Sequence, residues 1–511
     1  MKTIFLSAVL VLLTLVNSNA QNVLNLYVDK AEVKINKEIY GHFSEHLGTC
    51  IYGGIYVGED SDIPNVDGFR TDVVEALKAL KVPVLRWPGG CFADTYHWKD
   101  GIGPKEDRPS IVNVHWGGVT EDNSFGTHEF LNLCEIIGTE PYLSINVGSG
   151  TVQEAVEWVE YVTSSNESPM TELRKKNGRE DPWNVKFWGI GNETWGCGGD
   201  MRPEYYADIY RHYAGYIRGR EMQKIAVGPS SGDYNWTEKV MQILSQKRHL
   251  VQGLSLHHYT LPTGNWSSKG SSTEFGEDQY FSTLRNTMHV EELIQKHLAI
   301  MDRYDPQHRV SLIVDEWGTW YDPLPGSNPG FLQQQNTVRD AIVAGINLNI
   351  FNNYAERISM ANIAQVVNVL QAMILTDGAQ MVKTPTYHVF KMYNVHQDAT
   401  LVPSDLLCES YEFEGESLPA LTASASVKDG VFNITLSNAN PHKALSIECN
   451  IEGGNYSTAS GQIVSGENLA DYNDFGKEEK VSVKDFKVQK PKNGKLSVEI
   501  PPHSVVLVQL K

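Results

Sequence analysis

Cysteine is scarce in this sequence, with six residues among 511, and no two of them form a C-x-x-C pair. Widely separated cysteines favour neither a zinc ribbon nor a dense disulfide framework, so the sequence predicts no metal and no other cofactor. In an oxidising compartment some of them could pair, and their spacing leaves the connectivity open. The cysteines are Cys50, Cys91, Cys134, Cys197, Cys408 and Cys449.

Basic residues are also few, because 43 Lys and Arg stand against 62 Asp and Glu and give a formal charge of −19. A surface of this charge repels phosphate backbones, which argues against nucleic acid as a partner. Neutral polymers such as plant polysaccharides meet no such repulsion. The 11 Trp and 23 Tyr offer flat faces for sugar rings, although most aromatic side chains in any protein belong to its core.

The apolar run Ile4–Val16 falls short of the roughly 20 residues that a membrane helix needs, and no second run follows. Met1-Lys2 before this run and the small residues Ser18-Asn19-Ala20 after it are typical of a signal peptide over residues 1–20. Gln21 at the expected cut offers no thiol for a lipid anchor. We therefore expect a secreted or periplasmic protein with no membrane span.

No internal repeat is present, and between residues 37 and 390 short apolar runs alternate with helical patterns. This alternation indicates a parallel β/α architecture, and eight strands predict a closed (β/α)8 TIM barrel. The helical stretches include 73–80, 129–137, 152–162, 203–218, 289–301 and 336–350. The predicted strands are Ile39–Phe43, Pro83–Arg86, Pro141–Val147, Lys186–Gly191, Ile225–Gly228, Gly253–His258, Ser311–Asp315 and Ile358–Ile363.

The pattern changes in the last part of the chain. Alternating strands separated by Gly, Asn, Pro and Lys turns predict an all-β, jelly-roll-like sandwich over 391–511. The strand-like segments 23–26 and 31–35, within residues 21–36, precede the barrel, and we expect them to join this sandwich. The sandwich strands are expected at 421–427, 431–436, 445–451, 480–483, 496–500 and 504–510.

Two glutamates stand where predicted barrel strands end. Glu193 follows the fourth strand in GIGNETWG, and Glu316 follows the seventh in IVDEWGTWY. Active sites of such barrels lie at the carboxyl ends of the strands, so both carboxylates should meet at one mouth. An isolated glutamate at a strand end is usually solvated or ion-paired. Here each has a short polar residue before it and an aromatic after it, and nearby glycines leave room for a ligand, which favours a catalytic pair.

Four sequence motifs stand out: IYGHFSEHLGTCIYGGIY, RWPGGCFADTYHWKDGIGP, FWGIGNETWGCGG and VDEWGTWY. In this order and spacing they closely resemble the α-L-arabinofuranosidases of glycoside hydrolase family 51. The resemblance covers the barrel throughout and extends to the terminal sandwich. It implies a barrel with catalytic glutamates on strands four and seven and an accessory β-sandwich. Members of this family often form oligomers, so a homo-oligomer is among the expectations.

The paired glutamates also predict a mechanism. Retention of anomeric configuration requires two carboxyls roughly 5–5.5 Å apart, one to attack the sugar and one to protonate the departing oxygen. We assign the attack to Glu316 and the acid/base role to Glu193, whose pKa should be raised by the charge of Glu316 and by partial burial. Once Glu316 is esterified its charge disappears, so the pKa of Glu193 should fall and suit it to activate water.

Two further roles follow from the resemblance. Asn192 should hydrogen-bond the sugar 2-hydroxyl, although Asn192-Glu193-Thr194 is also a glycosylation sequon, at a buried strand end that makes a poor acceptor. Tyr259 should hold the nucleophile in line, with a locally satisfied core tyrosine as the alternative. His257 and His258 face opposite sides of a strand, so we interpret them as hydrogen-bonding side chains rather than ligands of one metal ion.

The loops after the first two strands supply more of the expected site. Glu45 in GHFSEHLG resembles the family's carboxylate that holds arabinose hydroxyls, with a buried ion pair to Arg86 as the alternative. Cys91 in RWPGGC resembles a substrate-contacting thiol, with a disulfide or plain core packing as the alternatives. Other residues that match pocket-lining positions of the family are Trp116, Trp320 and Gln365.

These observations predict a retaining, exo-acting α-L-arabinofuranosidase. Its partners would be arabinan, arabinoxylan or their oligosaccharides, with neither nucleic acid nor membrane. The glutamate pair specifies the mechanism and not the sugar, so a β-xylosidase or endoglucanase with the same machinery is the alternative. A carbohydrate-binding protein on an inactive barrel is a further alternative, which the presence of both glutamates disfavours.

Overall fold

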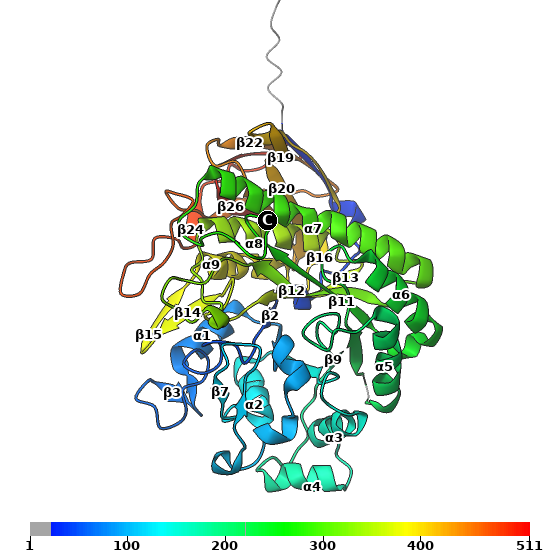
Figure 1. Ribbon diagram of the computed structural model, residues 1–511. Coiled ribbons are helices and arrows are strands. Elements are labelled where there is room, and N and C mark those ends of the chain that lie inside the picture. The colour runs from blue at the N-terminus through cyan, green and yellow to red at the C-terminus, as the bar shows by residue number, and fades with distance from the viewer. Residues whose placement is uncertain (1–21, 220) are drawn as a thin grey trace, which may run out of the picture.

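The computed structural model describes residues 22–219 and 221–511. Eight parallel strands close into a barrel in the order β10-β11-β12-β13-β2-β5-β8-β9. Figure 1 shows the strands of the C-terminal region in a separate part of the molecule. This arrangement confirms the predicted (β/α)8 barrel with an accessory all-β domain. The barrel strands are β2 (Gly41–Phe43), β5 (Val84–Trp87), β8 (Glu140–Ile145), β9 (Phe187–Ile190), β10 (Gln223–Ala226), β11 (Gly253–Thr260), β12 (Ser311–Thr319) and β13 (Ile358–Ala364).

Several helices begin at residues whose side chains cap the first turn. Thr151 accepts a hydrogen bond from Glu154 N at the start of α3, and Thr337 and Asp340 form a capping box at the start of α8. No helix in the described part of the chain is both long enough and apolar enough to cross a membrane. The helices are α1 (Thr71–Leu80), α2 (Thr127–Ile137), α3 (Val152–Thr163), α4 (Pro169–Lys176), α5 (Pro203–Tyr216), α6 (Tyr234–Leu244), α7 (Glu277–Tyr304), α8 (Val338–Asn353) and α9 (Pro385–Tyr393).

The barrel interior is divided into an apolar layer and a polar layer. Inward-facing residues of six strands form a buried apolar cluster, as in other filled barrels. Further toward the carboxyl ends of the strands, the interior side chains include Arg86, Asp315 and His257, which are charged or polar and buried. The apolar layer therefore lies directly beneath the polar groups at the mouth. Its residues are Val84, Tyr142, Phe187, Ile225, Ile313 and Met360.

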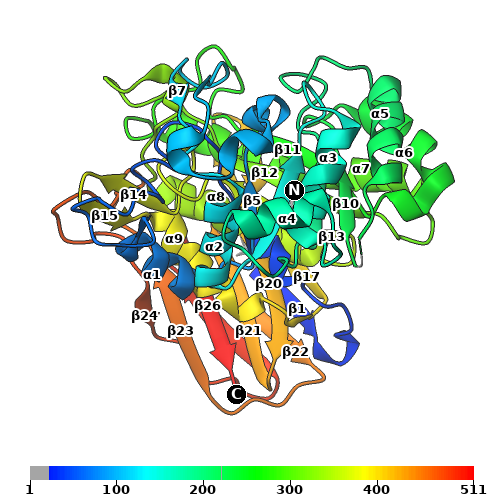
Figure 2. The same ribbon diagram turned by 90° about the horizontal axis from the view of Figure 1, so that it is seen from below.

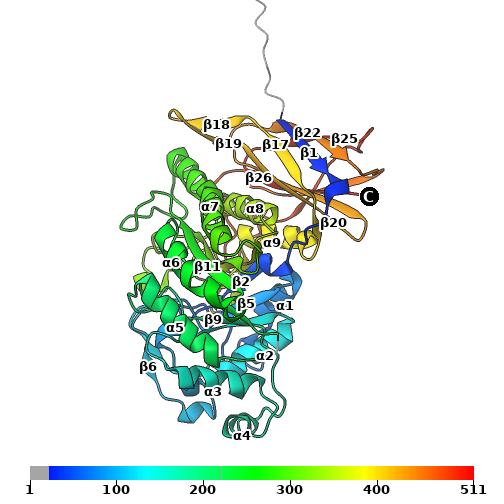
Figure 3. The same cartoon turned by 90° about the vertical axis from the view of Figure 1, so that its right-hand side faces the viewer.

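Two main sheets make up the C-terminal sandwich. The four-stranded sheet has the order β17-β1-β22-β25 and the six-stranded sheet has the order β16-β20-β21-β26-β23-β24. Figure 3 shows β1 (Asn22–Tyr27), in blue, between strands of the C-terminal region; it pairs in parallel with β22 and antiparallel with β17. The other strands are β16 (Thr400–Leu401), β17 (Ser404–Leu407), β20 (Leu421–Lys428), β21 (Val431–Asn438), β22 (Leu445–Glu452), β23 (Ala459–Val464), β24 (Lys484–Phe486), β25 (Lys495–Ile500) and β26 (Ser504–Leu510).

Two of the strands expected from the sequence are wrong. Residues 480–483 form no strand, because Val481 is fixed by hydrogen bonds with the Asn473 side chain, and β24 begins only at Lys484. The segment 31–35 also forms no strand and contains only an isolated bridge between Lys34 and Thr400. Both segments have apolar alternation. Val481 is held by a side chain, whereas Ile35 N donates to Ala399 O and Leu401 N donates to Val33 O, so 31–35 lies beside the sandwich with a single bridge and no ladder. Short hairpins complete the fold: β3–β4 (65–70), β6–β7 (111–121), β14–β15 (374–383) and β18–β19 (410–419).

Helix α8 joins the two parts of the molecule. Its residues Val338–Asn352 are all buried, since one side faces the barrel and the other faces the six-stranded sheet (Figure 2). On the sandwich side, Asn349 Nδ2 donates to Thr422 Oγ1 at 3.1 Å and Asn352 Nδ2 donates to Ser424 Oγ at 3.0 Å. A helix that is buried all round needs such partners for its polar side chains.

Candidate active site

Glu193 lies on a tight loop beyond β9. Its φ angle of +39° is in the left-handed region, which costs a residue other than glycine roughly 1–2 kcal/mol. The carbonyl oxygen of Glu193 accepts hydrogen bonds from Gly196 N at 2.8 Å and Gly198 N at 3.1 Å. A Cβ atom at Gly198 would lie only 2.0 Å from the carbonyl oxygen of Asn192, so the turn requires glycine there. The side chain of Glu193 is 18% exposed at the mouth of the barrel.

Glu316 lies inside strand β12 and is more deeply buried, with 6% of its side chain exposed. The register between β12 and β13 shifts between Val314 and Trp317, and this irregularity lets the successive residues Asp315 and Glu316 both reach the interior. Glu316 Oε1 accepts a hydrogen bond from Arg86 Nη1 at 2.9 Å, and Oε2 accepts one from the Tyr259 hydroxyl at 2.9 Å. Each oxygen of Glu316 thus has its own hydrogen-bond donor, which fixes the orientation of the group.

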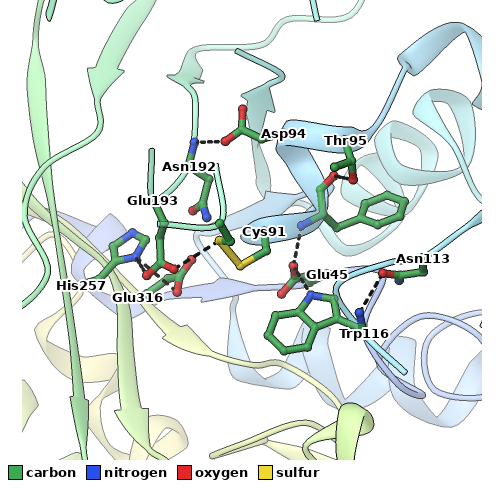
Figure 4. Close-up of a disulfide and its surroundings, with 12 residues drawn as sticks. Glu45, Cys91, Asp94, Thr95, Asn113, Trp116, Asn192, Glu193, His257 and Glu316 are labelled. Atoms are coloured by element: carbon green, nitrogen blue, oxygen red, sulfur yellow. Dashed lines mark hydrogen bonds and ion pairs between the residues drawn. A yellow bond between two sulfur atoms is a disulfide. The ribbon is translucent and has the colours of Figure 1, made fainter. Parts of the chain in front are cut away.

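The two glutamates meet around His257 of β11. Figure 4 shows their carboxylates pointing toward each other from opposite ribbons. His257 Nδ1 lies 2.7 Å from Glu193 Oε1 and 3.4 Å from Glu316 Oε2, and one oxygen of each glutamate lies within 4.8 Å of the other. The imidazole Nε2 is 3.1 Å from Asp315 Oδ1. The structure therefore brings the two predicted glutamates together at one end of the barrel.

Burial and charge act on this cluster in opposite directions. Burial disfavours the charged form of His257, but Glu316, Asp315 and Glu193 outweigh it and raise the pKa of His257 to about 10. Burial and the charge of Glu316 raise the pKa of Glu193, whereas His257 and Arg86 lower it. The arrangement thus pairs a carboxylate with a carboxyl group that tends to hold its proton.

Arg86 and Asn192 connect the nucleophile side of the site to the loop of Glu193. Arg86 Nη2 donates a hydrogen bond to Asn192 Oδ1. Arg86 forms ion pairs with Glu316 at 2.9 Å and with Asp315 at 3.8 Å, rather than with Glu45. Asn192 Nδ2 is buried and has no partner among the described residues. A buried amide donor without a partner beside two carboxylates is suited to a ligand hydroxyl.

Glu45 lies just beyond β2 and is 2% exposed. Its Oε1 accepts hydrogen bonds from Phe92 N at 3.1 Å and Trp116 Nε1 at 2.8 Å, and its Oε2 accepts one from Gln365 Nε2 at 3.1 Å. Burial and the charge of Glu316 raise the pKa of Glu45 to about 7, although the hydrogen bonds from Phe92 and Trp116 oppose this rise. Gly90 lies between the two acids, since a Cβ there would be 3.0 Å from Glu316 Oε1 and 3.4 Å from Glu45 Oε2.

Cys91 is not a free thiol in the structure. Its sulfur is bonded to Cys197, with the two Cα atoms 5.5 Å apart, and the bridge links the loop after β5 to the loop after β9. The expectation of a substrate-contacting thiol is therefore wrong, because the sulfur is already bonded and the alternative of a disulfide applies. Cys197 Sγ lies 3.6 Å from Glu193 Oε2, so the bridge still borders the site.

The remaining predicted residues surround the same mouth. Trp116 is held by Asn113 Oδ1, which accepts its backbone N–H at 3.1 Å. Trp320 packs edge-on against Tyr259 and against Trp266, which is 56% exposed. Gln365 Oε1 and Trp320 Nε1 are buried and lack partners among the residues described. These polar atoms, like Asn192 Nδ2, are available to a bound molecule.

Two groups at the mouth have the composition of a metal site. Glu193, His257 and Glu316 offer one ligand atom each within 4.8 Å, and Cys91, Glu193 and Cys197 do the same. In the first group, a raised His257 pKa favours an imidazolium, which donates protons and repels a cation. In the second, both sulfurs are in the disulfide and are not thiolate ligands. The donor chemistry therefore fits hydrogen bonding better than metal binding.

Asp94 and Asp315 belong to the site as well, although neither was singled out for a role from the sequence. Asp315 precedes Glu316, and only the irregular register of β12 turns it inward. Asp94 lies in the FADTYHW part of a recognised motif, but its partners are backbone N–H groups of distant loops. Such partners leave no signal in residue type or spacing, so no sequence pattern could have identified them.

A (β/α)8 barrel whose mouth holds two carboxyl groups this close is the architecture of a retaining glycoside hydrolase. The family model described as "Alpha-L-arabinofuranosidase 1 domain" matches residues 76–274, and "Alpha-L-arabinofuranosidase C-terminal domain" matches residues 315–504. An "Intracellular exo-alpha-L-arabinofuranosidase" from Bacteroides ovatus is 54% identical, over 96% of this chain and 95% of that protein. The chain belongs to the α-L-arabinofuranosidases of glycoside hydrolase family 51.

Solved structures agree with this assignment. The family 51 arabinofuranosidase of Xanthomonas axonopodis pv. citri superposes with a TM-score of 0.94 at 48% identity, covering 96% of this chain and 100% of that one. An arabinose complex of the α-L-arabinofuranosidase of Thermotoga maritima gives a TM-score of 0.82 at 30% identity, with coverage of 96% and 99%. The family and the fold expected from the sequence motifs are confirmed.

The expected export of the protein is contradicted. The relative from Bacteroides ovatus, which matches nearly the full length of the chain, is described as intracellular. Residues 1–20, which we interpreted as a signal peptide for a secreted or periplasmic protein, lie outside the described residues. An apolar run followed by small residues is a compositional signal and does not by itself define the compartment in which a protein acts.

Proposed function

We propose that this chain is a retaining, exo-acting α-L-arabinofuranosidase that releases terminal arabinofuranosyl residues from arabinan, arabinoxylan or their oligosaccharides. The observation that carries the proposal is the approach of Glu193 and Glu316 oxygens to within 4.8 Å. Inverting enzymes need roughly 6.5–9.5 Å between carboxyls to admit a water molecule. The names of the relatives support the sugar, because one is described as an exo-α-L-arabinofuranosidase and another as an arabinose complex of an α-L-arabinofuranosidase.

In the first step, the Glu316 carboxylate attacks the anomeric carbon while Glu193 gives its proton to the glycosidic oxygen. The aglycone leaves as an alcohol, and the arabinosyl group is bound to Glu316 as an ester. In the second step, Glu193 takes a proton from water, the water oxygen attacks the anomeric carbon, and the Glu316 carboxylate is released. Each step inverts the anomeric centre, so the product retains the configuration of the substrate.

The surrounding charges support both roles of Glu193. Before the reaction, burial and the negative charge of Glu316 raise the pKa of Glu193 and favour the acid. Esterification removes that negative charge, whereas the positive charges of His257 and Arg86 persist and lower the pKa. Glu193 then favours the carboxylate that the second step requires. Tyr259 and Arg86 keep the two oxygens of Glu316 oriented during attack.

The substrate contacts form the other part of the proposal. The unpartnered Nδ2 of Asn192 would bind the 2-hydroxyl of the sugar, a bond that strengthens as positive charge develops in the ring. Glu45, held by Trp116 and Gln365, would accept hydrogen bonds from other hydroxyls. Trp320 offers an aromatic face. Cys91 would border the sugar through its disulfide with Cys197.

The stereochemical course tests the proposal. In the presence of methanol, proton NMR of a reaction on 4-nitrophenyl α-L-arabinofuranoside should first show methyl α-L-arabinofuranoside. A β-product at early times would refute retention. Turnover of xylopyranosides or glucans without turnover of arabinofuranosides would refute the sugar assignment and leave the mechanism standing. Release of arabinose alone from branched arabinan, without internal cuts, is expected of an exo-acting enzyme.

The domain limits and assembly are also proposals. We place the barrel at 37–390 and the sandwich at 391–511, and we assign residues 21–36 to the sandwich as well. The pairing of β1 with β17 and β22 supports the assignment of these N-terminal residues to the sandwich.

A homo-oligomer is proposed on the family resemblance. Light scattering on a gel-filtration column measures the mass in solution, and a monomer of 57.1 kDa would refute it.

A further inference from the structure

Asp94 ties three loops at the barrel mouth together. It lies in the 3-10 turn Cys91–Thr95 after β5 and is 2% exposed. Its Oδ2 accepts a hydrogen bond from Asn192 N at 2.8 Å, which Figure 4 shows. Its Oδ1 accepts bonds from Val147 N at 2.7 Å and Gly148 N at 3.1 Å. One carboxylate thus satisfies backbone donors of the loops that follow β8 and β9.

The packing around Asp94 leaves little freedom to replace these bonds. A Cβ atom at Gly198 would lie 2.6 Å from Asp94 Oδ2, and one at Gly148 would lie 2.7 Å from the Asp94 carbonyl oxygen. Ser149 N also donates to that carbonyl oxygen, at 3.0 Å. Burial raises the pKa of Asp94 to about 7, while the three backbone N–H bonds and Arg86 oppose this rise. The surroundings of Asp94 therefore fit a side chain with two acceptor oxygens.

Asp94 holds the backbone N–H of Asn192, the residue directly before Glu193. Glu193 has a φ angle of +39°, a conformation that persists only when the surroundings enforce it. Asp94 fixes the chain on the amino side of Glu193, and the Cys91–Cys197 bridge, which starts in the same turn, fixes it on the carboxyl side. If either the Asp94 hydrogen bond or the disulfide is removed, the loop can adopt a less strained backbone conformation in which the Glu193 carboxyl group is displaced.

We propose that Asp94 is a positioning residue for the acid/base: it holds the Gly191–Asn192 peptide, one residue before Glu193, so that Glu193 faces the glycosidic oxygen. This inference rests on the proposed function and deepens it. Asp94 itself touches neither the substrate nor the reacting atoms in this mechanism. Because attack by Glu316 proceeds from a separate strand, loss of Asp94 should act mainly on proton transfer, and any displacement of Asn192 should lower the rate on every substrate alike.

The variant Asp94→Asn tests this role, because asparagine keeps the size but replaces one acceptor oxygen by an N–H₂ group that opposes a backbone N–H. With arabinobiose, whose leaving group needs protonation, kcat/KM should fall about 10²-fold. With 2,4-dinitrophenyl α-L-arabinofuranoside, which needs no acid, kcat/KM should fall less than about fivefold, and azide should raise kcat. Asp305→Asn is the matched control, since Asp305 is buried and accepts Val310 N at 2.7 Å between α7 and β12, on the other side of the barrel.

The outcomes separate the hypotheses. Equal losses on both substrates, or an Asp305→Asn variant with the same leaving-group dependence, would overturn the positioning role. Glu193→Ala is measured alongside. If the rate of Glu193→Ala does not depend on the leaving group, the proposed function fails. If Glu193→Ala depends on the leaving group and Asp94→Asn does not, only the role of Asp94 fails. Circular dichroism and thermal unfolding verify folding. If Asp94→Asn does not fold, Asp94→Glu is measured in the same way, and failure of both to fold would make Asp94 a requirement of the fold and overturn the proposal.

Discussion

The two glutamates at the mouth are held by different kinds of structure. Glu316 is part of strand β12, in register with His257 of β11, and its carboxylate is bound by side chains of the barrel wall. Glu193 lies beyond the end of β9 on a strained turn, fixed by Asp94 and by a disulfide. The group that forms a covalent bond thus belongs to the rigid sheet, and the group that exchanges protons belongs to a loop. Substitutions away from the two acids should therefore disturb the acid/base more readily than the nucleophile.

Removal of the nucleophile should have the largest effect. Glu316→Ala is expected to lower kcat by at least about 10⁴-fold on every arabinofuranoside, because the covalent step has no substitute. Azide should give no product of retained configuration. Initial rates with a 4-nitrophenyl arabinofuranoside and NMR of the azide reaction measure both. Retained product at a wild-type rate would mean that the nucleophile lies elsewhere.

Removal of the acid/base should have a smaller and more selective effect. Glu193→Ala should lower kcat/KM by about 10²–10⁴-fold on substrates with poor leaving groups and much less on activated ones. Azide should restore turnover of the activated substrates, as it attacks the ester without needing a base. A series of aryl arabinofuranosides with different leaving-group pKa values measures this. A flat series would contradict the assigned role.

The histidine between the two acids should shift the pH profile. Burial and Glu316 raise the pKa of Glu193, and His257 opposes them. Since kcat/KM requires protonated Glu193, it falls as pH rises through this pKa. His257→Gln should therefore move the alkaline limb to higher pH. His258→Gln is the control, because burial lowers the pKa of His258 to about 4 and leaves it neutral over the profile. An unmoved limb in His257→Gln would show that the histidine does not control Glu193.

The disulfide should have the smallest effect on rate. In Cys91→Ser/Cys197→Ser the Asp94 tie remains, so kcat/KM should fall less than about tenfold, whereas the unfolding free energy should fall by ~2–4 kcal/mol. Denaturant unfolding measures the stability, with Cys408→Ser, which removes a free cysteine, as control. Thiol titration of the unfolded wild type should find four free cysteines. Six would mean that the bridge does not form in solution.

The fold and the positions of the two glutamates could be predicted because each depends on local sequence. Short apolar runs alternating with helical patterns define the barrel, and residues directly after such runs lie at its mouth. Glu193 and Glu316 follow the fourth and seventh runs, and the structure brings them together. Their chemical roles stay predictions. Not every sandwich strand could be predicted in this way, since the 480–483 segment has the alternating pattern of a strand but its Val481 backbone bonds to the Asn473 side chain.

The rest of the site depends on contacts that the sequence does not encode locally. The pairing of Cys91 with Cys197 depends on two loops that only the closed barrel places side by side. The inward turn of Asp315 depends on an irregular register, and the role of Asp94 on three backbone donors. In each case the informative partner is a backbone group or a residue more than fifty positions away. Residue type alone therefore cannot identify the contact.

Helix α8 determines how this enzyme can be divided. Because it is buried on both sides, a chain cut after the barrel would expose its apolar residues and leave Asn349 and Asn352 without their sandwich partners. The catalytic barrel is therefore not a portable module that recombination could attach to a different accessory domain.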